Sequence, residues 1–200
     1  MQRLRGRVQA GLTTPAAVRL EAPAPFGAPL FILAAPNERG TLLLPRDHRV
    51  IRDTSVRDVL GALAGIELGS ADLRALLSGC VVSDPRAEGA RNYPRGWVAV
   101  DLQGGGVVWV RQTCARWRVD AAEHAGLITE YRDHGADVIP RTLRVRSAPG
   151  AQAADIDLSI SLTQVDLNVP LAPEAFDVMI PPGTAAITLD ELRTRGPLVQ

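Results

Sequence analysis

The sequence contains no lysine: all 22 of its basic residues are arginine, and 22 acidic residues bring the formal net charge to zero. The absence of lysine excludes Schiff-base chemistry and a phosphate-binding P-loop, because both depend on a lysine amine. Aromatic residues make up only 4% of the chain. A neutral chain with few rings for base stacking is not a basic nucleic-acid-binding domain. We attribute the exclusive use of arginine to a GC-rich genome and not to a function.

Long hydrophobic runs are also absent. The longest apolar stretches, such as Leu30–Ala35 and Leu42–Pro45, are far shorter than the roughly 20 residues that a transmembrane helix needs. The first residues, Met1 to Arg7, alternate like a strand and do not have the pattern of a secretory signal. We therefore expect that any export signal or lipid anchor of the natural protein lies outside this sequence.

Only two cysteines are present, Cys80 and Cys114, and they lack the CxxC spacing of a redox or zinc site. In a reducing compartment they would be two buried thiols, whereas in an exported protein a disulfide is favoured. The three histidines, His48, His124 and His134, do not have the short spacing of zinc ligands either. The sequence therefore predicts no metal site and no cofactor.

Motifs for catalysis are missing as well. The run Gly104–Gly106 leads from one strand into another, so no helix N-terminus follows it to receive a phosphate. Ser78 lacks the context of a nucleophile elbow. Asp155 and Asp157 lie two apart on a strand-like run, which points both to the solvent face and not into a catalytic pair. We therefore expect a protein that is not an enzyme.

The pattern that is present alternates with a period of two, which is typical of half-buried antiparallel strands. The clearest alternating runs span residues 17–20, 115–120, 143–146 and 156–162. Turn-forming residues separate such runs at short spacing, for example Pro36–Gly40, Gln103–Gly106 and Asp120–Gly126. A chain of 200 residues is long enough for one domain with its own core. We predict a single mainly β domain over residues 1–200, with about eleven antiparallel strands.

Three segments depart from simple alternation. After residue 162 the apolar set shifts parity to Val165, Leu167 and Val169, which predicts a bulge near Thr163–Gln164 in one long strand. The polar stretch Asp84–Pro94 predicts an exposed loop. Only residues 54–79 have a helical pattern, and they predict two short helices. In the second of these, we expect Ser70 to be the N-cap.

Three segments resemble the bacterial lipoprotein-localisation (LolA/LolB-like) family, and its outer-membrane receptor branch in particular. The first is Ala17-Val18-Arg19-Leu20 followed by Pro25-Phe26-Gly27 and a long apolar strand. The second is Leu63-Ala64-Gly65-Ile66 with the helix Leu73 to Gly79, and the third is the closing Phe176-Asp177-Val178-Met179-Ile180-Pro181-Pro182-Gly183. The resemblance spans most of the chain.

The resemblance implies an unclosed, strongly curved antiparallel β-barrel whose apolar concave face forms a trough, with the helix pair at about 54–79 as a lid. It implies a non-enzymatic carrier that accepts an acylated cargo, a lipoprotein or lipid, and hands it on. The trough residues that we expect are Val18, Leu20, Leu42, Leu44, Trp117, Val119, Leu127, Leu143, Val145, Leu158 and Ile160. The lid residues are Leu60, Leu63, Leu73 and Leu77. From the residues alone, the same alternating set also fits a filled core in a structural or assembly protein of the cell envelope.

The resemblance further implies that Pro25, Phe26 and Gly27 form a tip that faces the membrane; the alternative is a Phe26 ring folded onto the core. It places the protein on the periplasmic side of the cell envelope, with a transient membrane contact or an outer-membrane lipid anchor. The expected partners are acyl chains, without nucleic acid, and the expected state is a monomer. For an exported protein we expect a disulfide between Cys80 and Cys114. Arginines such as Arg19, Arg116, Arg118, Arg144 and Arg146 alternate with the apolar set, so we expect them on the convex, solvated face.

Overall fold

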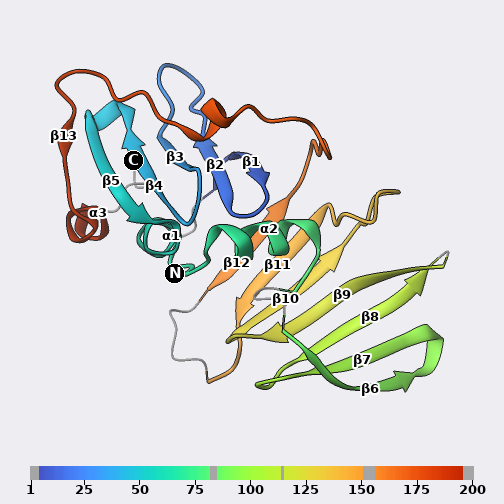
Figure 1. Ribbon diagram of the computed structural model, residues 1–200. Helices are drawn as coiled ribbons and strands as arrows, with labels where there is room; N and C mark the ends of the chain where they lie inside the picture. The colour runs from blue at the N-terminus through green and yellow to red at the C-terminus, as the bar shows by residue number, and fades with distance from the viewer. Residues whose placement is uncertain (1–4, 82–84, 114, 151–155, 196–200) are drawn as a thin grey trace. The chain divides into compact units, whose positions relative to one another are not determined.

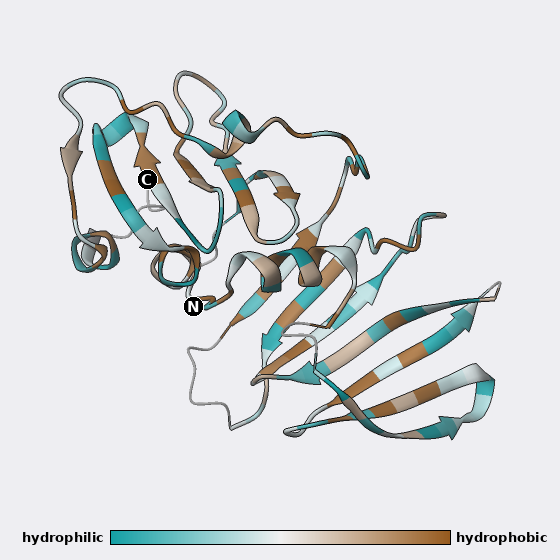
Figure 2. Ribbon diagram, viewed as in Figure 1, coloured by the Kyte–Doolittle hydropathy of each residue, from teal (hydrophilic) through white to brown (hydrophobic). Residues whose placement is uncertain are grey.

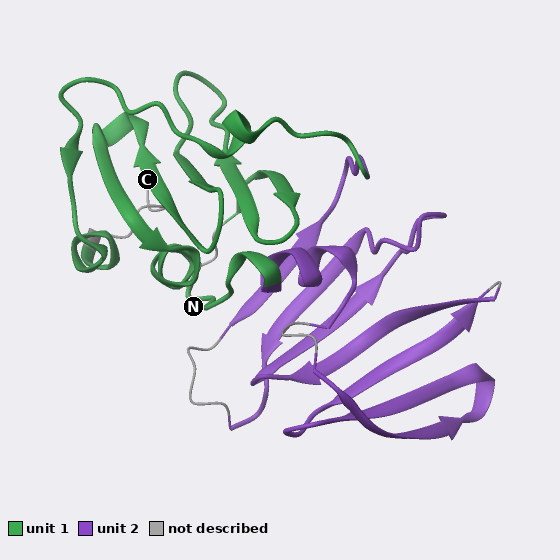
Figure 3. Ribbon diagram, viewed as in Figure 1, with its two compact units in different colours: residues 1–71, 168–200 green, residues 72–167 purple. Residues whose placement is uncertain are grey.

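The computed structural model describes residues 5–81, 85–113, 115–150 and 156–195. They form two compact units: residues 1–71 with 168–200 make unit 1, and residues 72–167 make unit 2 (Figure 3). The thirteen strands of the described residues belong to two sheets, one of six strands and one of seven. The prediction of a mainly β, antiparallel protein is confirmed, whereas the single curved barrel of about eleven strands is not. Among the described residues, no helix has the length and apolar character that crossing a bilayer requires.

The sheet of unit 1 is an antiparallel meander with one short parallel strand at its edge (Figure 1). Its spatial order follows the chain: β1 (Gln9–Thr13), β2 (Ala17–Ala22), β3 (Phe31–Ala35), β4 (Arg39–Leu44), β5 (Arg49–Ser55) and then β13 (Ala185–Ala186). The expected turn at Pro36–Gly40 does connect β3 to β4, but it is shorter than predicted because Arg39 and Gly40 already belong to β4. Buried side chains lie on both faces, for instance Leu33 and Leu42 on one and Leu43 and Val50 on the other.

Two helices and two 3₁₀ turns complete unit 1: α1 (Val56–Ala64), α3 (Leu189–Arg195), η1 (Pro45–Asp47) and η3 (Pro173–Phe176). Helix α1 begins where Ser55 accepts a hydrogen bond from the Asp58 N–H at 3.3 Å, and it ends at Gly65, whose φ of 72° suits glycine. Its buried face packs against α3, β4 and β5. The sequence therefore located the first helix correctly.

Helix α2 (Ser70–Ser78) begins in unit 1 and continues in unit 2. We expected Ser70 to cap it, but the capping group is the carboxylate of Glu38, from the turn before β4. That carboxylate accepts hydrogen bonds from the N–H of Ser70 at 3.0 Å and of Ala71 at 3.4 Å. The negative charge also suits the positive end of the helix. A side chain 32 residues away in sequence thus defines where α2 starts.

The sheet of unit 2 is a seven-stranded antiparallel meander. Along the chain its strands are β6 (Ala87–Tyr93), β7 (Trp97–Leu102), β8 (Val107–Thr113), β9 (Arg116–His124), β10 (Leu127–Arg132), β11 (Thr142–Ser147) and β12 (Asp157–Ser161), with η2 (Pro94–Gly96) between β6 and β7. Hydropathy alternates along several of these strands (Figure 2). The expected turn at Gln103–Gly106 connects β7 to β8.

Three predictions for unit 2 were wrong. The stretch 84–94 contains β6, an edge strand whose residues are all exposed and so show no apolar alternation. β9 runs on to His124, which shortens the turn predicted at Asp120–Gly126. β12 ends at Ser161 and the chain then leaves the sheet, so no bulged strand continues through Val165 to Val169. In that segment Leu167 and Val169 are exposed, and they have no sheet neighbour to pack against.

The register divides the seven-stranded sheet into two chemically different faces. The apolar face carries the buried residues Leu102, Val108, Ala122, Tyr131, Leu143 and Val145. The arginine face carries Arg91, Arg111, Arg118, Arg132, Arg144 and Arg146. This division is what the alternation of apolar and charged residues requires of a half-solvated sheet.

Candidate functional site

The residues predicted to line a trough are divided between the two sheets. In unit 1, Val18, Leu20, Leu42 and Leu44 share one face of the six-stranded sheet and are at most 6% exposed. In unit 2, the other members share the apolar face; they are Trp117, Val119, Leu127, Leu143, Val145, Leu158 and Ile160. Within each sheet, the sequence therefore grouped residues that do lie on one face.

Burial differs within the unit 2 group. Leu143 and Val145 are fully buried, Val119, Leu127, Leu158 and Ile160 are partly buried, and Trp117 is 55% exposed near one end of β9. Of the predicted lid residues, Leu63 on α1 is buried, whereas Leu60 on α1 and Leu73 and Leu77 on α2 are partly buried. The most buried apolar residue of α2 is Leu76, which is not among the predicted lid residues.

Phe26 is the most prominent apolar side chain among the predicted site residues. Phe26 is 88% exposed, so its ring is not folded onto the core, which was the alternative to an exposed tip. The guanidinium of Arg46, from η1, donates hydrogen bonds to the carbonyl oxygens of Phe26 at 2.7 Å and Ala28 at 3.0 Å. Gly27 has a φ of 77°, a conformation that side chains with a Cβ rarely adopt. The loop is thus held by its backbone, and the ring is left in solvent.

The cysteine prediction falls partly outside the described residues, because Cys114 is not among them. Cys80 is exposed, and its carbonyl oxygen accepts a hydrogen bond from the Tyr131 hydroxyl at 2.9 Å. Burial, followed by the nearby Cys80, raises the pKa of Tyr131, so this phenol remains a hydrogen-bond donor. The disulfide itself stays a prediction. Within the described residues, no cluster of three or more His, Cys, Asp or Glu side chains is placed to hold a metal ion.

A polar depression of about 540 Å³ lies in unit 2. Its lining mixes arginines, carboxylates and aromatic residues: Trp97, Arg111, Arg118, Asp120, Ala121, Glu130, Tyr131, Arg132, Asp133 and His134. Most of these residues belong to β7–β10, and the last two follow β10 directly. The sequence analysis did not select this site, because it treated the charged residues between apolar ones as a solvated surface.

Asp120 lines this depression and pairs with two of its arginines. A bulge in β9 opposite Trp109 and Val110 makes Asp120 the extra residue between Val119 and Ala121. One oxygen of its carboxylate lies 2.9 Å from Nη2 of Arg111, and the other lies 2.8 Å from Nε of Arg118. The Asp120 side chain is only 9% exposed. These two ion pairs are short, but no aligned hydrogen bond within the described residues reaches either carboxylate oxygen.

His134 approaches Asp120 from the segment after β10. Its Nδ1 lies 4.0 Å from an Asp120 oxygen, and its Nε2 lies 3.2 Å from the carbonyl oxygen of Val119, to which the ring can donate. Burial, reinforced by the positive charge of Arg118, lowers the pKa of His134. The ring is therefore neutral at neutral pH, and it adds no positive charge to the depression.

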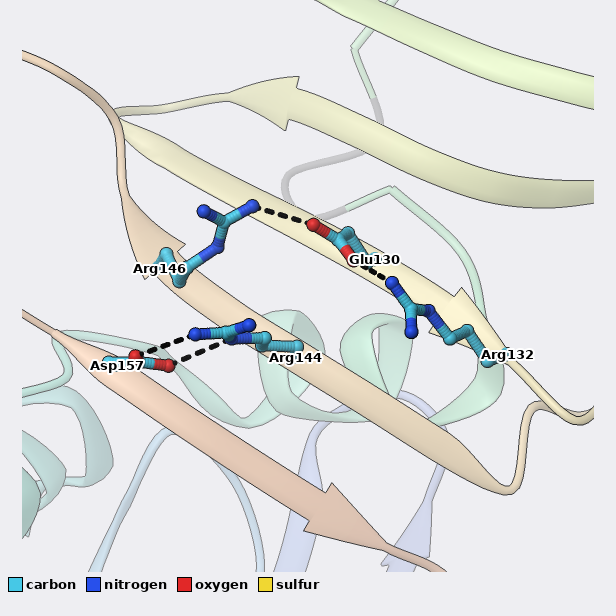
Figure 4. A network of polar contacts seen from close by, with 5 residues as sticks. All are labelled: Glu130, Arg132, Arg144, Arg146 and Asp157. Atoms are coloured by element: carbon cyan, nitrogen blue, oxygen red, sulfur yellow. Dashed lines mark hydrogen bonds and ion pairs between the residues drawn. The ribbon is translucent and has the colours of Figure 1, made fainter.

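A second polar network on the same sheet includes Glu130 and Arg132, which also line the depression (Figure 4). Glu130 accepts hydrogen bonds from Arg132 at 2.7 Å and from Arg146 at 2.6 Å. Burial acts to raise the pKa of Glu130, but these two arginines hold it below its ordinary value. Arg144 and Asp157 form a separate bidentate pair with distances of 3.1 and 2.9 Å. Exposed ion pairs of the Arg144 type contribute little to stability.

We compared the chain with models of known protein families, with curated proteins and with solved structures, and no match was found in any of the three.

Proposed function

We propose that this protein binds the acyl chain of a lipid or lipoprotein and hands it on without covalent chemistry. The observation that carries the proposal is Phe26, an aromatic ring left 88% exposed on a loop whose backbone Arg46 holds. An exposed ring gains no stability in the folded protein, and insertion into an apolar phase would recover about 1.5–3 kcal/mol for a side chain of this size. The segment resemblance to the lipoprotein-localisation family supports the same function.

The apolar sheet faces provide the second support. An acyl chain gains about 0.8 kcal/mol for each methylene removed from water, so a carrier needs a long apolar surface. The predicted trough residues share one face within each sheet, and partly buried members such as Leu158 and Ile160 are the ones we expect a bound chain to cover. The proposal includes the unclosed, strongly curved barrel and the helical lid that the resemblance implies.

The cellular setting belongs to the same proposal. The carrier acts as a monomer on the periplasmic side of the cell envelope, and it contacts the membrane transiently or through a lipid anchor. Because the net charge is zero, this contact depends on the apolar tip and not on electrostatic attraction to anionic lipids.

Vesicle binding by the Phe26→Ala variant tests the proposed contact. We expect the variant to bind phosphatidylcholine vesicles about tenfold or more weakly than the unaltered protein, since a buried Phe is replaced by a methyl group. Met179→Ala is the matched control, because Met179 is also exposed, over 92% of its surface. Equal losses for both variants would show that the tip has no special role, and no vesicle binding by the unaltered protein would contradict the proposal.

A second candidate is a structural or assembly protein whose sheet faces are already filled. It is favoured by the complete burial of Val18, Leu42, Leu143 and Val145 by the protein's own atoms. In that case the apolar faces are cores, and the purified protein will carry no lipid and take up no fatty acid.

A further inference from the structure

Two of the arginines that line the unit 2 depression lie side by side. Arg111 on β8 and Arg118 on β9 are directly opposite in the register, so both side chains leave the sheet on the arginine face. Directly opposed residues have Cβ atoms about 5 Å apart, and like charges in such a pair are destabilising. A gain in folding stability therefore does not explain why two arginines occupy these opposed positions.

Asp120 compensates only one of the two charges. Its ion pairs with Arg111 and Arg118 leave the three-residue cluster with one net positive charge. Glu130 does not supply the missing negative charge, because Arg132 and Arg146 share it. Asp133 also lines the depression and stays charged while it accepts a hydrogen bond from Thr142, so Arg111, Arg118, Arg132 and Arg146 face three carboxylates and one positive charge remains. The lowered pKa of His134 keeps that ring neutral.

The hydrogen-bond donors of the pair are also in excess. Within the described residues, the buried Nε of Arg111 meets no acceptor, whereas Nε of Arg118 lies 2.8 Å from an Asp120 oxygen without an aligned hydrogen bond. Each guanidinium carries five N–H donors in a planar fork that matches the oxygens of a phosphate or carboxylate. Trp97, directly opposite Arg111 on β7, lies under that guanidinium with 4.7 Å between the Arg111 Cζ atom and the ring centroid. This stacking fixes the plane of the Arg111 guanidinium.

We propose that this depression binds a phosphoryl group carried on a small polar molecule, with Arg111 and Arg118 as its ligands. The phosphoryl group supplies both the missing negative charge and acceptors for the unpaired donors. A space of about 540 Å³ is larger than a phosphoryl group alone, and it lies within the range of small-molecule sites. Trp97 and Asp120 are positioning residues: the ring holds Arg111 in plane, and the carboxylate holds the two guanidiniums together. The phosphoryl group comes either from a soluble phosphoester or from a phospholipid headgroup.

Calorimetric titration with glycerol 3-phosphate tests the site, and flotation with phosphatidic acid vesicles against phosphatidylcholine vesicles tests the headgroup source. Whichever of the two probes binds, we expect Arg118→Gln and Arg111→Gln to weaken its binding about tenfold or more, because each substitution removes charge-assisted hydrogen bonds. Arg144→Gln is the matched control: it removes one arginine from the same face, outside the depression. Arg118→Lys keeps the positive charge but lacks the planar set of guanidinium donors. It therefore tests whether the donor geometry matters, even if Arg118→Gln fails to fold.

The outcomes separate the sources. Binding of glycerol 3-phosphate assigns a soluble ligand, and selective binding of phosphatidic acid vesicles alone assigns a headgroup. The proposal is overturned if neither probe binds, if Arg144→Gln weakens binding as much as Arg118→Gln, or if Arg118→Lys binds as tightly as the unaltered protein. Phe26 and the trough residues do not line this depression, so loss of acyl binding and loss of phosphoryl binding are independent results.

Discussion

Replacing Asp120 by asparagine removes the charge that holds Arg111 and Arg118 together. The side chain keeps its size, but the two opposed guanidiniums lose their shared carboxylate. Breaking a buried ion pair costs about 3–5 kcal/mol. The arginines are 36% and 21% exposed, so water screens part of their repulsion. We therefore expect a loss of about 2 kcal/mol in the free energy of unfolding, roughly a thirtyfold change in the folding equilibrium.

Urea unfolding followed by circular dichroism measures this loss, with Asp101→Asn as the control. Asp101 pairs with Arg91 on the same face of the sheet, but its side chain is 40% exposed. An exposed pair contributes about 0–1 kcal/mol, so the control should unfold close to the unaltered protein. Equal destabilisation by the two substitutions would refute the reasoning, because the Asp120 cluster would then behave as an ordinary surface pair.

Two further predictions concern pH and the second helix. Because the pKa of His134 is lowered in the folded state, the unfolded chain binds a proton first as the pH falls below 6.5. The free energy of unfolding should therefore fall from pH 6.5 down through the folded-state pKa and level off below it. Urea unfolding at a series of pH values measures this fall, and His134→Gln should remove the part that is due to His134. An unchanged dependence of the unfolding free energy on pH in this variant would contradict the prediction. Glu38→Ala should destabilise the start of α2 by about 1 kcal/mol, because it removes the acceptor for two helix N–H groups. Hydrogen exchange at Ser70 and Ala71 should then be about fivefold faster, and unchanged protection would show that Glu38 is not the cap.

Local patterns in the sequence predicted the elements that have local causes. Turn residues marked the connections β3–β4 and β7–β8, and α1 and α2 lie inside the predicted segment 54–79, whereas α3 lies outside it. Alternation grouped residues such as Leu143 and Leu158 on one face, because the side-chain period of a strand is set by its backbone. The strand β6 escaped prediction, since an exposed edge strand has no buried side for apolar residues.

Long-range pairing was not predictable in the same way. The division of the strands into two sheets depends on which edges pair, and no local pattern encodes that choice. Asp120 illustrates the limit at the level of a site. The alternation around it predicted a solvated surface, but the bulge in β9 and the approach of His134 leave its side chain only 9% exposed. Such burial depends on the tertiary arrangement of residues that look like surface charges in the sequence.

The most direct measurement for the central claim is native mass spectrometry of the purified, intact protein, followed by organic extraction and lipid analysis. The account predicts a bound fraction whose added mass matches an acyl lipid, which the extraction then identifies. It also predicts that a fluorescent fatty acid will displace this lipid. A protein that carries no lipid and takes up no fatty acid would contradict the carrier function and favour filled apolar faces.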